Sequence, residues 1–198
     1  MNSLKIKGAY LKNADLKGFT IARQRCMLWF FDYPDSEMSL NDLSIKLGIS
    51  KTTARKTVLQ LESEGFLARK ELGKTWRISC NHSHPYNSTI KISTHLDMIY
   101  RTELINEIHR MLPNARAVML FGSYRKGDDN ETSDIDLAAE IISDKGLFIQ
   151  EIGVIPRLGY RKNVKVNLHI FSRKKVDPNL FANIANGIVL SGFLEVKP

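Results

Sequence analysis

Apolar residues recur with a helical period in the first third of the chain and predict two short helices there. The first is expected over Ile21–Phe31, and Pro34 ends it, because proline removes a backbone donor and does not fit a helix interior. The second is expected over Leu40–Leu47, and Ser39 opens it in the style of a capping box. Gly48 ends this helix, because glycine readily adopts the left-handed conformation found just after helices.

A third helix is predicted over Lys51–Glu64, between the capping residue Ser50 and Gly65. Its apolar residues at positions i, i+4 and i+7 are Ala54, Val58 and Leu61. They form one inward face, so the polar and basic side chains of the helix are expected to point outward or to flank that face. These polar and basic residues are Lys51, Thr52, Thr53, Arg55, Lys56 and Gln60.

Two short strand-like runs follow, and Leu72-Gly73-Lys74 between them predicts a hairpin. Three helices and a hairpin in this order resemble the winged helix-turn-helix family over residues 21–79. The resemblance implies a DNA-binding domain in which residues 51–60 enter the major groove. It also implies that Lys74 and Arg77, on the wing, contact backbone phosphates. A winged helix used only for protein contacts or dimerisation is the alternative, and the polar, basic outward face favours DNA.

The chain then changes from a basic helical region to a polar stretch. Residues 81–88 are polar and contain Pro85, which is typical of a linker between domains. Apolar residues at helical spacing predict one helix over Thr94–Met111. The expected parts of the chain are a winged helix domain over residues 1–80, with an N-terminal arm over residues 1–20, a linker over residues 81–94, and a second domain over residues 95–198.

The second domain contains the most informative pattern, a Gly-Ser pair followed after ten residues by Asp-x-Asp. The apolar run Ala117–Phe121 leads into Gly122-Ser123, and apolar residues surround Asp134 and Asp136. The layout predicts a buried strand, a tight polar turn and a second buried strand. Because residues i and i+2 of a strand point to the same face, both aspartates are expected to project together.

Paired carboxylates beside a glycine-containing turn are typical of nucleoside triphosphate chemistry. Two carboxylates on one face repel each other unless a cation lies between them, and Mg²⁺ is commonly held by one or two carboxylates plus substrate phosphates. Gly122 would let the backbone approach a phosphate, and Ser123 would donate hydrogen bonds to it. Arg125 or Lys126 would neutralise phosphate charge. A solvated strand end and an ordinary turn are the simpler interpretations of each motif taken alone.

The segments Leu120–Gly127 and Ser133–Leu137 resemble the nucleotidyltransferase superfamily related to DNA polymerase beta, and within it the minimal nucleotidyltransferases. The resemblance covers residues 115–192. It implies a small mixed sheet flanked by helices, and transfer of a nucleoside monophosphate from a nucleoside triphosphate. By this resemblance the triphosphate contacts are Gly122 and Ser123, and the catalytic residues, which bind Mg²⁺ or alternatively Mn²⁺, are Asp134 and Asp136.

One position departs from that family's pattern. A third carboxylate is usual on a later strand, and Asn167, within the strand-like run Val164–Phe171, is its best match here. An amide brings no negative charge, so the transfer rate would fall even where nucleotide still bound. His169 lies on the same strand face and is an alternative base, although a lone strand histidine is more often structural. Glu140 shares a face with Asp136 but lies about 13 Å away along the strand, too far to replace the missing ligand.

Composition and charge narrow the class of partner. The net charge of the 198 residues is +8, and residues 1–80 carry fourteen Lys and Arg against eight Asp and Glu. The basic excess therefore lies in the N-terminal part, which favours a polyanion such as DNA. No apolar stretch approaches the roughly 18 residues that predict a membrane span. The N-terminus lacks the apolar region of a signal peptide, so we expect a cytoplasmic protein with no membrane partner.

The two cysteines, Cys26 and Cys80, are far apart in the sequence and do not predict a disulfide framework. Cys80 is followed closely by His82 and His84, which invites a zinc interpretation. Structural zinc sites usually use wider spacings and four ligands, so we do not expect one here.

Together these patterns predict an α+β protein, with an N-terminal winged helix-turn-helix and a C-terminal α/β nucleotidyltransferase-like domain. The leading functional hypothesis is a DNA-binding, Mg²⁺-dependent nucleotidyltransferase. The resemblance to minimal nucleotidyltransferases implies a small helical protein as one partner and acceptor, and a homodimer is also kept open. The second hypothesis is a transcription regulator whose C-terminal domain binds nucleotide without transferring it, and Asn167 is the residue that favours this alternative.

Overall fold

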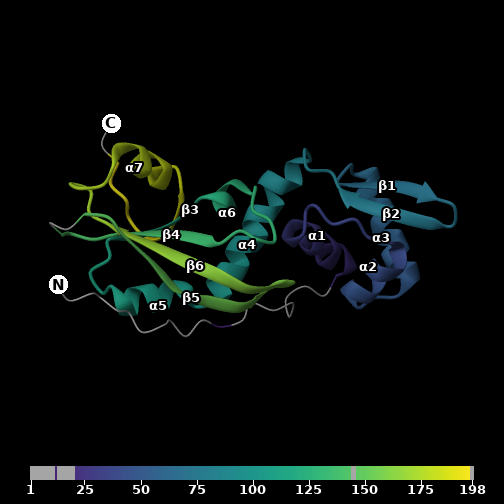
Figure 1. Ribbon diagram of the computed structural model, residues 1–198, viewed down its shortest axis with the longest axis horizontal. Coiled ribbons are helices and arrows are strands. Elements are labelled where there is room, and N and C mark those ends of the chain that lie inside the picture. Colours follow the sequence, from purple (N-terminus) through teal and green to yellow (C-terminus); the bar gives the residue numbers. More distant parts are fainter. Residues whose placement is uncertain (1–11, 13–20, 144–145, 197–198) are drawn as a thin grey trace.

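Figure 1 shows the computed structural model of the protein, which describes residues 12, 21–143 and 146–196. An N-terminal lobe of helices and a hairpin lies at one end, and a sheet with its own helices forms a C-terminal lobe at the other. The predicted arm over residues 1–20 lies outside the described residues, apart from Lys12. In the described part of the chain, none of the helices has both the length and the apolar character that crossing a bilayer requires.

The N-terminal lobe consists of three helices and a two-stranded hairpin, in the order that the sequence predicts. Its elements are α1 (Ala22–Asp32), α2 (Leu40–Leu47), α3 (Lys51–Ser63), β1 (Leu67–Leu72) and β2 (Thr75–Cys80). Ser39 caps α2 by accepting a hydrogen bond from the backbone N–H of Asp42. Ser50 caps α3 in the same way through the N–H of Thr53. Gly48, with a φ of 63°, ends α2 in the left-handed conformation.

Aromatic and aliphatic side chains fill the core of this lobe. The largest of them are Phe30, Phe31, Leu43, Leu61, Phe66 and Ile78. On α3, the residues Ala54, Val58 and Leu61 are buried, as their spacing predicts. The opposite, polar face of α3 is consequently left on the surface.

The stretch predicted as a linker carries regular structure. It contains the 3₁₀ helix η2 (Pro85–Ser88), and α4 (Ile90–Arg101) begins within it. The Asn81 side chain donates a hydrogen bond to the carbonyl of Gly65 at 2.9 Å, which ties the start of this stretch to the end of α3. The chain therefore passes from one lobe to the other through hydrogen-bonded backbone.

The single helix predicted over Thr94–Met111 is two helices, α4 and α5 (Leu104–Met111). Glu103 separates them with a φ of 58°, in the left-handed region that a continuous helix does not use. The hydroxyl of Thr102 donates to the carbonyl of Ile99 and so satisfies the end of α4. The prediction of one helix was wrong, because the apolar spacing continues across the break.

The C-terminal lobe is built on a five-stranded mixed sheet with the strand order β5-β6-β4-β3-β7. Its strands are β3 (Ala117–Phe121), β4 (Ile135–Glu140), β5 (Phe148–Leu158), β6 (Arg161–Phe171) and β7 (Ile188–Gly192). Strands β4 and β6 run parallel, and the other neighbouring pairs run antiparallel. The connecting helices are α6 (Ser123–Lys126) after β3 and α7 (Pro178–Ala185) before β7.

Helices cover both faces of this sheet, and the alternation along β4 decides which face receives each residue. Ile135 and Leu137 belong to the cluster that α4 and α5 cover, together with Met98 and other apolar side chains. Ala138 belongs to the opposite cluster, which contains Ile184 of α7. Asp136 alternates with Ile135 and Leu137, so it points to the face that carries α7.

Helix α1 makes contacts in both lobes. Its Leu28 side chain is buried in the C-terminal core, while its neighbours fill the N-terminal core. The Asp32 carboxylate accepts the backbone N–H of Tyr160 at 2.8 Å, and the Tyr33 hydroxyl donates to the carbonyl of Tyr160 at 3.2 Å. The tip of the β5–β6 hairpin is therefore bound to the end of α1.

Candidate active site

Asp134 and Asp136 lie at the start of β4 and converge on Asn167 of β6. Asn167 is the register partner of Asp136 in the parallel pairing of these strands. The Asn167 side-chain nitrogen lies 3.4 Å from a carboxylate oxygen of Asp134 and 3.4 Å from one of Asp136. Both hydrogen bonds are long. The amide therefore lies between two like charges and weakens their repulsion, in the place where a cation would act.

His169 lies two residues further along β6, on the same face. Its Nε2 is 3.6 Å from Oδ1 of Asp136, and its ring meets the Phe121 ring edge-on with 4.9 Å between centroids. Its Nδ1 is buried without a hydrogen-bond partner among the described residues. The structure thus brings the alternative base predicted from the sequence next to the carboxylates. Glu140, in contrast, pairs with Arg173 at 2.8 Å and lies at the far end of β4.

The donor set of this site fits one hard cation. The two carboxylates supply oxygen ligands and negative charge, and the Asn167 amide would add a third oxygen if its planar group turned over. Among the described residues, no three His, Cys, Asp or Glu side chains form a metal-binding group. A second cation would therefore depend on phosphate oxygens and water rather than on protein carboxylates.

Gly122 allows strand β3 to pass close to Asp136. Its φ of 74° and ψ of −151° are unusual for any residue with a side chain. A Cβ atom at this position would lie 2.9 Å from Oδ2 of Asp136. The Gly-Ser pair and the paired aspartates are therefore direct neighbours in space, as the resemblance stated above implies.

Ser123 opens the short helix α6, where the sequence predicted a tight turn. This helix also carries Arg125 and Lys126, whose side chains are exposed. Both basic residues line a cavity of about 250 Å³ between α6 and α7. The full lining is Phe121, Gly122, Arg125, Lys126, Leu180, Asn183 and Asn186. The sequence motifs did not mark Asn183 or Asn186 as members of a site.

Comparison with known proteins bears on the lobe that contains these residues. Residues 103–192 match the family model described as Polymerase beta, Nucleotidyltransferase. The match begins just before α5, ends with β7, and contains the Gly-Ser pair and both aspartates. It supports a nucleotidyltransferase domain in the C-terminal lobe and does not extend to the N-terminal lobe. No curated protein matches the chain.

Buried charges hold the loop between α6 and β4 of the nucleotidyltransferase domain. Asp129 in this loop lies 3.4 Å from Nζ of Lys91 and 3.4 Å from Nδ1 of His95, both on α4. Nε2 of His95 lies 3.3 Å from the carboxylate of Asp32 at the end of α1. All four side chains are buried. They come from three separate segments, so no local pattern in the sequence marks them as a group.

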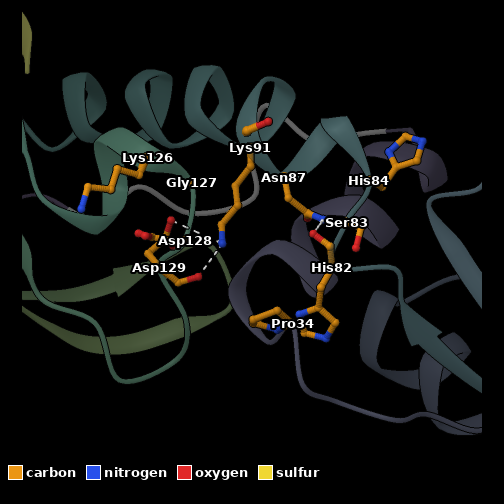
Figure 2. Close-up of a pocket in the computed structure, with 11 residues that line it drawn as sticks. Pro34, His82, Ser83, His84, Asn87, Lys91, Lys126, Gly127, Asp128 and Asp129 are labelled. Atoms are coloured by element: carbon orange, nitrogen blue, oxygen red, sulfur yellow. Dashed lines mark hydrogen bonds and ion pairs between the residues drawn. The ribbon is translucent and has the colours of Figure 1, made fainter. Parts of the chain in front are cut away.

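Figure 2 shows a cavity of about 360 Å³ beside this group, between the two lobes. Pro34 and His82 line it from the N-terminal side, and Asp128 and Asp129 line it from the nucleotidyltransferase side. The Lys91 side chain extends towards Asp129 and binds its carboxylate and its backbone carbonyl. The ammonium group is thus used within the protein.

The residues that invite a zinc interpretation have other contacts. The Cys80 thiol donates to the Asn87 side chain at 3.8 Å, and burial raises the pKa of this thiol to about 11. His84 uses both ring nitrogens, since Nδ1 accepts the N–H of Tyr86 and Nε2 lies 3.0 Å from the carbonyl of Glu64. These contacts stabilise the boundary between the hairpin and η2.

The side chains predicted to contact DNA lie on exposed parts of the N-terminal lobe. They are Lys51, Thr52, Thr53, Arg55, Lys56 and Gln60 on α3, Lys74 at the hairpin tip and Arg77 on β2. The Arg55 guanidinium lies over the Trp76 ring, 5.2 Å from its centroid, and Arg77 pairs with Glu37 at 3.3 Å. A cavity of about 400 Å³ between α3 and the hairpin is lined by three of the basic residues.

The buried group around His95 gives the protein a pH-dependent stability. Burial alone would lower the pKa of His95, but hydrogen bonds to Asp129 and Asp32 outweigh it and raise this pKa above the ordinary 6.5. Burial would raise the pKa of Asp129, but the bond from His95 outweighs it and holds this pKa below the ordinary 3.8. Stabilisation by His95 is therefore complete below pH 6.5 and is lost as pH rises through the raised pKa. Stabilisation by Asp129 is complete above pH 3.8 and is lost as pH falls through the lowered pKa.

We predict that His95→Gln lowers the free energy of unfolding by about 3 kcal/mol near pH 5, because it leaves buried carboxylates without their partner. The deficit should shrink as pH rises through the raised pKa of His95. Urea titrations of the wild type and the variant between about pH 5 and pH 9 measure it. His82→Gln, at a histidine whose side chain is 60% exposed, is the control. A deficit that stays constant across this range would contradict the prediction.

Proposed function

We propose that this protein is a DNA-binding nucleotidyltransferase that uses Mg²⁺ to transfer a nucleoside monophosphate from a nucleoside triphosphate to an acceptor group. The observation that carries the proposal is the contact between Gly122 and Asp136, which joins the Gly-Ser pair to the paired carboxylates. The family match over residues 103–192 supports nucleotidyl transfer as the reaction class.

The residues around the Gly-Ser pair suit a triphosphate. Gly122 leaves room for a phosphate to approach the backbone, and Ser123 would donate a hydrogen bond from its hydroxyl. Arg125 and Lys126, exposed on the same short helix, would neutralise phosphate charge. The cavity between α6 and α7 would receive the nucleoside, since the amides of its two asparagines both donate and accept hydrogen bonds.

The carboxylates of Asp134 and Asp136 would hold Mg²⁺, or Mn²⁺ in its place. When bound, the ion would neutralise charge that develops on the leaving pyrophosphate. Transfer forms a bond between the acceptor oxygen and the α-phosphorus, breaks the bond to pyrophosphate, and releases the proton of the acceptor. His169, whose Nε2 lies 3.6 Å from Asp136, is placed to receive that proton.

The N-terminal lobe would bind duplex DNA through α3 and the hairpin. This part of the proposal is supported by the exposed basic residues of α3 and by the charge excess of residues 1–80. Lys51 and Arg55 would contact the major groove, and Lys74 at the hairpin tip would contact backbone phosphates. Binding to DNA would hold the nucleotidyltransferase domain near a chromosomal site.

Calorimetry with Mg²⁺ and ATP tests the nucleotide site. The double variant Asp134→Asn/Asp136→Asn removes both carboxylates and should weaken binding of the Mg²⁺–ATP complex about tenfold, because only the phosphate contacts remain. Asp128→Asn/Glu131→Gln removes the same charge from exposed positions of the same loop and should bind like the wild type. Equal affinity in the first variant and the wild type would reject the assignment of the metal site.

A second function is favoured by one observation, the amide of Asn167 between the two carboxylates. In this alternative the protein is a transcription regulator whose C-terminal lobe binds nucleotide as a signal without transferring it. Incubation with labelled ATP, Mg²⁺ and candidate acceptors separates the two functions. Label that becomes covalently attached to an acceptor, and that the Asp134→Asn/Asp136→Asn variant does not attach, supports transfer.

A further inference from the structure

Arg161 is a buried cation at the first position of β6. Only 3% of its surface is exposed. Its two terminal nitrogens donate in different directions, Nη1 to the hydroxyl of Tyr124 and Nη2 to the backbone carbonyl of Ser133. Its guanidinium also lies over the Tyr124 ring, 5.6 Å from the centroid. Among the described residues, no carboxylate forms an ion pair with it.

Those two partners are the immediate neighbours of the predicted active-site residues. Tyr124 follows Ser123 in α6, and Ser133 precedes Asp134 in the loop before β4. One rigid, planar guanidinium therefore contacts the segment that carries the Gly-Ser pair and the segment that carries the paired carboxylates. A buried charge without a carboxylate partner is costly. Its hydrogen bonds to both segments offset part of that cost.

The position of Arg161 is in turn set by the N-terminal lobe. The preceding residue, Tyr160, gives its backbone N–H to Asp32 at 2.8 Å and accepts the Tyr33 hydroxyl at 3.2 Å. Both partners lie at the end of α1. The guanidinium is thus attached to a hairpin tip whose backbone is fixed from outside the nucleotidyltransferase domain.

We propose that Arg161 is a positioning residue for nucleotidyl transfer, which fixes Ser123 and Asp134 relative to each other so that both meet one triphosphate with its metal. This inference rests on the proposed function, because it concerns the same site. It adds a residue that touches neither substrate nor metal and acts through Tyr124 and Ser133.

The test compares three variants with the wild type by calorimetry with Mg²⁺ and ATP, at a temperature where thermal melts show each protein folded. Arg161→Gln should weaken binding about tenfold and lower the transfer rate further, because misplacement of the reacting groups by about 1 Å costs up to about a hundredfold. Arg161→Lys keeps the charge but lacks the planar fork that reaches both partners, so it should not restore affinity. Arg157→Gln, at an exposed arginine of the same hairpin, should bind like the wild type.

The variant Tyr124→Phe removes only the hydroxyl that accepts from Arg161. If the two residues act together, its effect on affinity and that of Arg161→Gln should be less than multiplicative in the double variant. A purely structural role would lower the melting temperature and leave the affinity of the folded protein unchanged.

The outcomes separate this inference from the proposed function. A wild type that does not bind Mg²⁺–ATP overturns the proposed function and this inference with it. A wild type that binds, together with folded Arg161 variants of equal affinity, overturns this inference alone. If Arg161→Gln does not fold, Arg161→Lys and Tyr124→Phe decide, and unchanged affinity in both would overturn the role of Arg161.

Discussion

Replacing Arg55 and Lys56 by glutamate is expected to abolish duplex DNA binding while the fold is retained. Both side chains are exposed on α3, so the substitutions disturb no core contact. Each reversal removes a cation that would neutralise a phosphate and adds an anion that repels one. The combined effect should be a loss of affinity of more than about a hundredfold, and the binding of the wild type should weaken steeply with added salt.

A gel shift with a duplex of mixed sequence, at two salt concentrations, measures this loss. Lys174→Glu/Lys175→Glu is the matched control, because it changes the net charge by the same amount at exposed positions of the C-terminal lobe. If the control loses as much affinity as Arg55→Glu/Lys56→Glu, binding depends on net charge alone. Duplex binding that survives in Arg55→Glu/Lys56→Glu would reject α3 as the recognition helix. A wild type that binds no duplex would favour a protein-contact role for this lobe.

Asn167→Asp is expected to raise the rate of nucleotidyl transfer about a hundredfold, if the neutral amide limits the wild-type reaction. The new carboxylate would stand about where the amide nitrogen now lies, 3.4 Å from oxygens of both aspartates. Three carboxylates at this spacing repel one another and attract a second cation. The added charge would also accept a proton from the attacking hydroxyl.

Two measurements check this prediction. The first is the rate of label transfer from ATP in the presence of Mg²⁺. The second is the melting temperature with and without Mg²⁺, because repulsion should destabilise Asn167→Asp in a chelator and the cation should reverse this loss. Asn163→Asp, at an exposed position of the same strand, should change neither quantity. A fast wild type that slows on Asn167→Asp would indicate that the amide is part of a working one-metal site.

Local signals in the sequence predict the N-terminal lobe closely. The boundaries of α2 are correct because Ser39 and Gly48 each act on the adjacent backbone and need no distant partner. The face of α3 is correct because burial in a helix follows its period. The break between α4 and α5 could not be predicted in this way, since the apolar spacing runs through Thr102 and Glu103 without a change.

The active site is predictable only where its residues belong to short motifs. Gly122, Asp134 and Asp136 are marked by their neighbours along the chain, and the register of β4 and β6 explains why Asn167 joins them. The partners of Arg161 lie 37 and 28 residues away in the sequence. Such a contact depends on how the hairpin packs on the loop, which neither composition nor periodicity encodes.

The attachment of the β5–β6 hairpin to α1 limits how this protein can be divided or recombined. A fragment that ends near residue 80 would expose Leu28 and leave the buried carboxylate of Asp32 without its partners. Such a fragment should aggregate or lose stability, even though its own helices and hairpin are complete. Exchange of either half for that of another protein would succeed only if the new half brought a matching hairpin tip or helix end. Natural recombination at this boundary is disfavoured for the same reason, so the two halves are expected to be inherited as one unit.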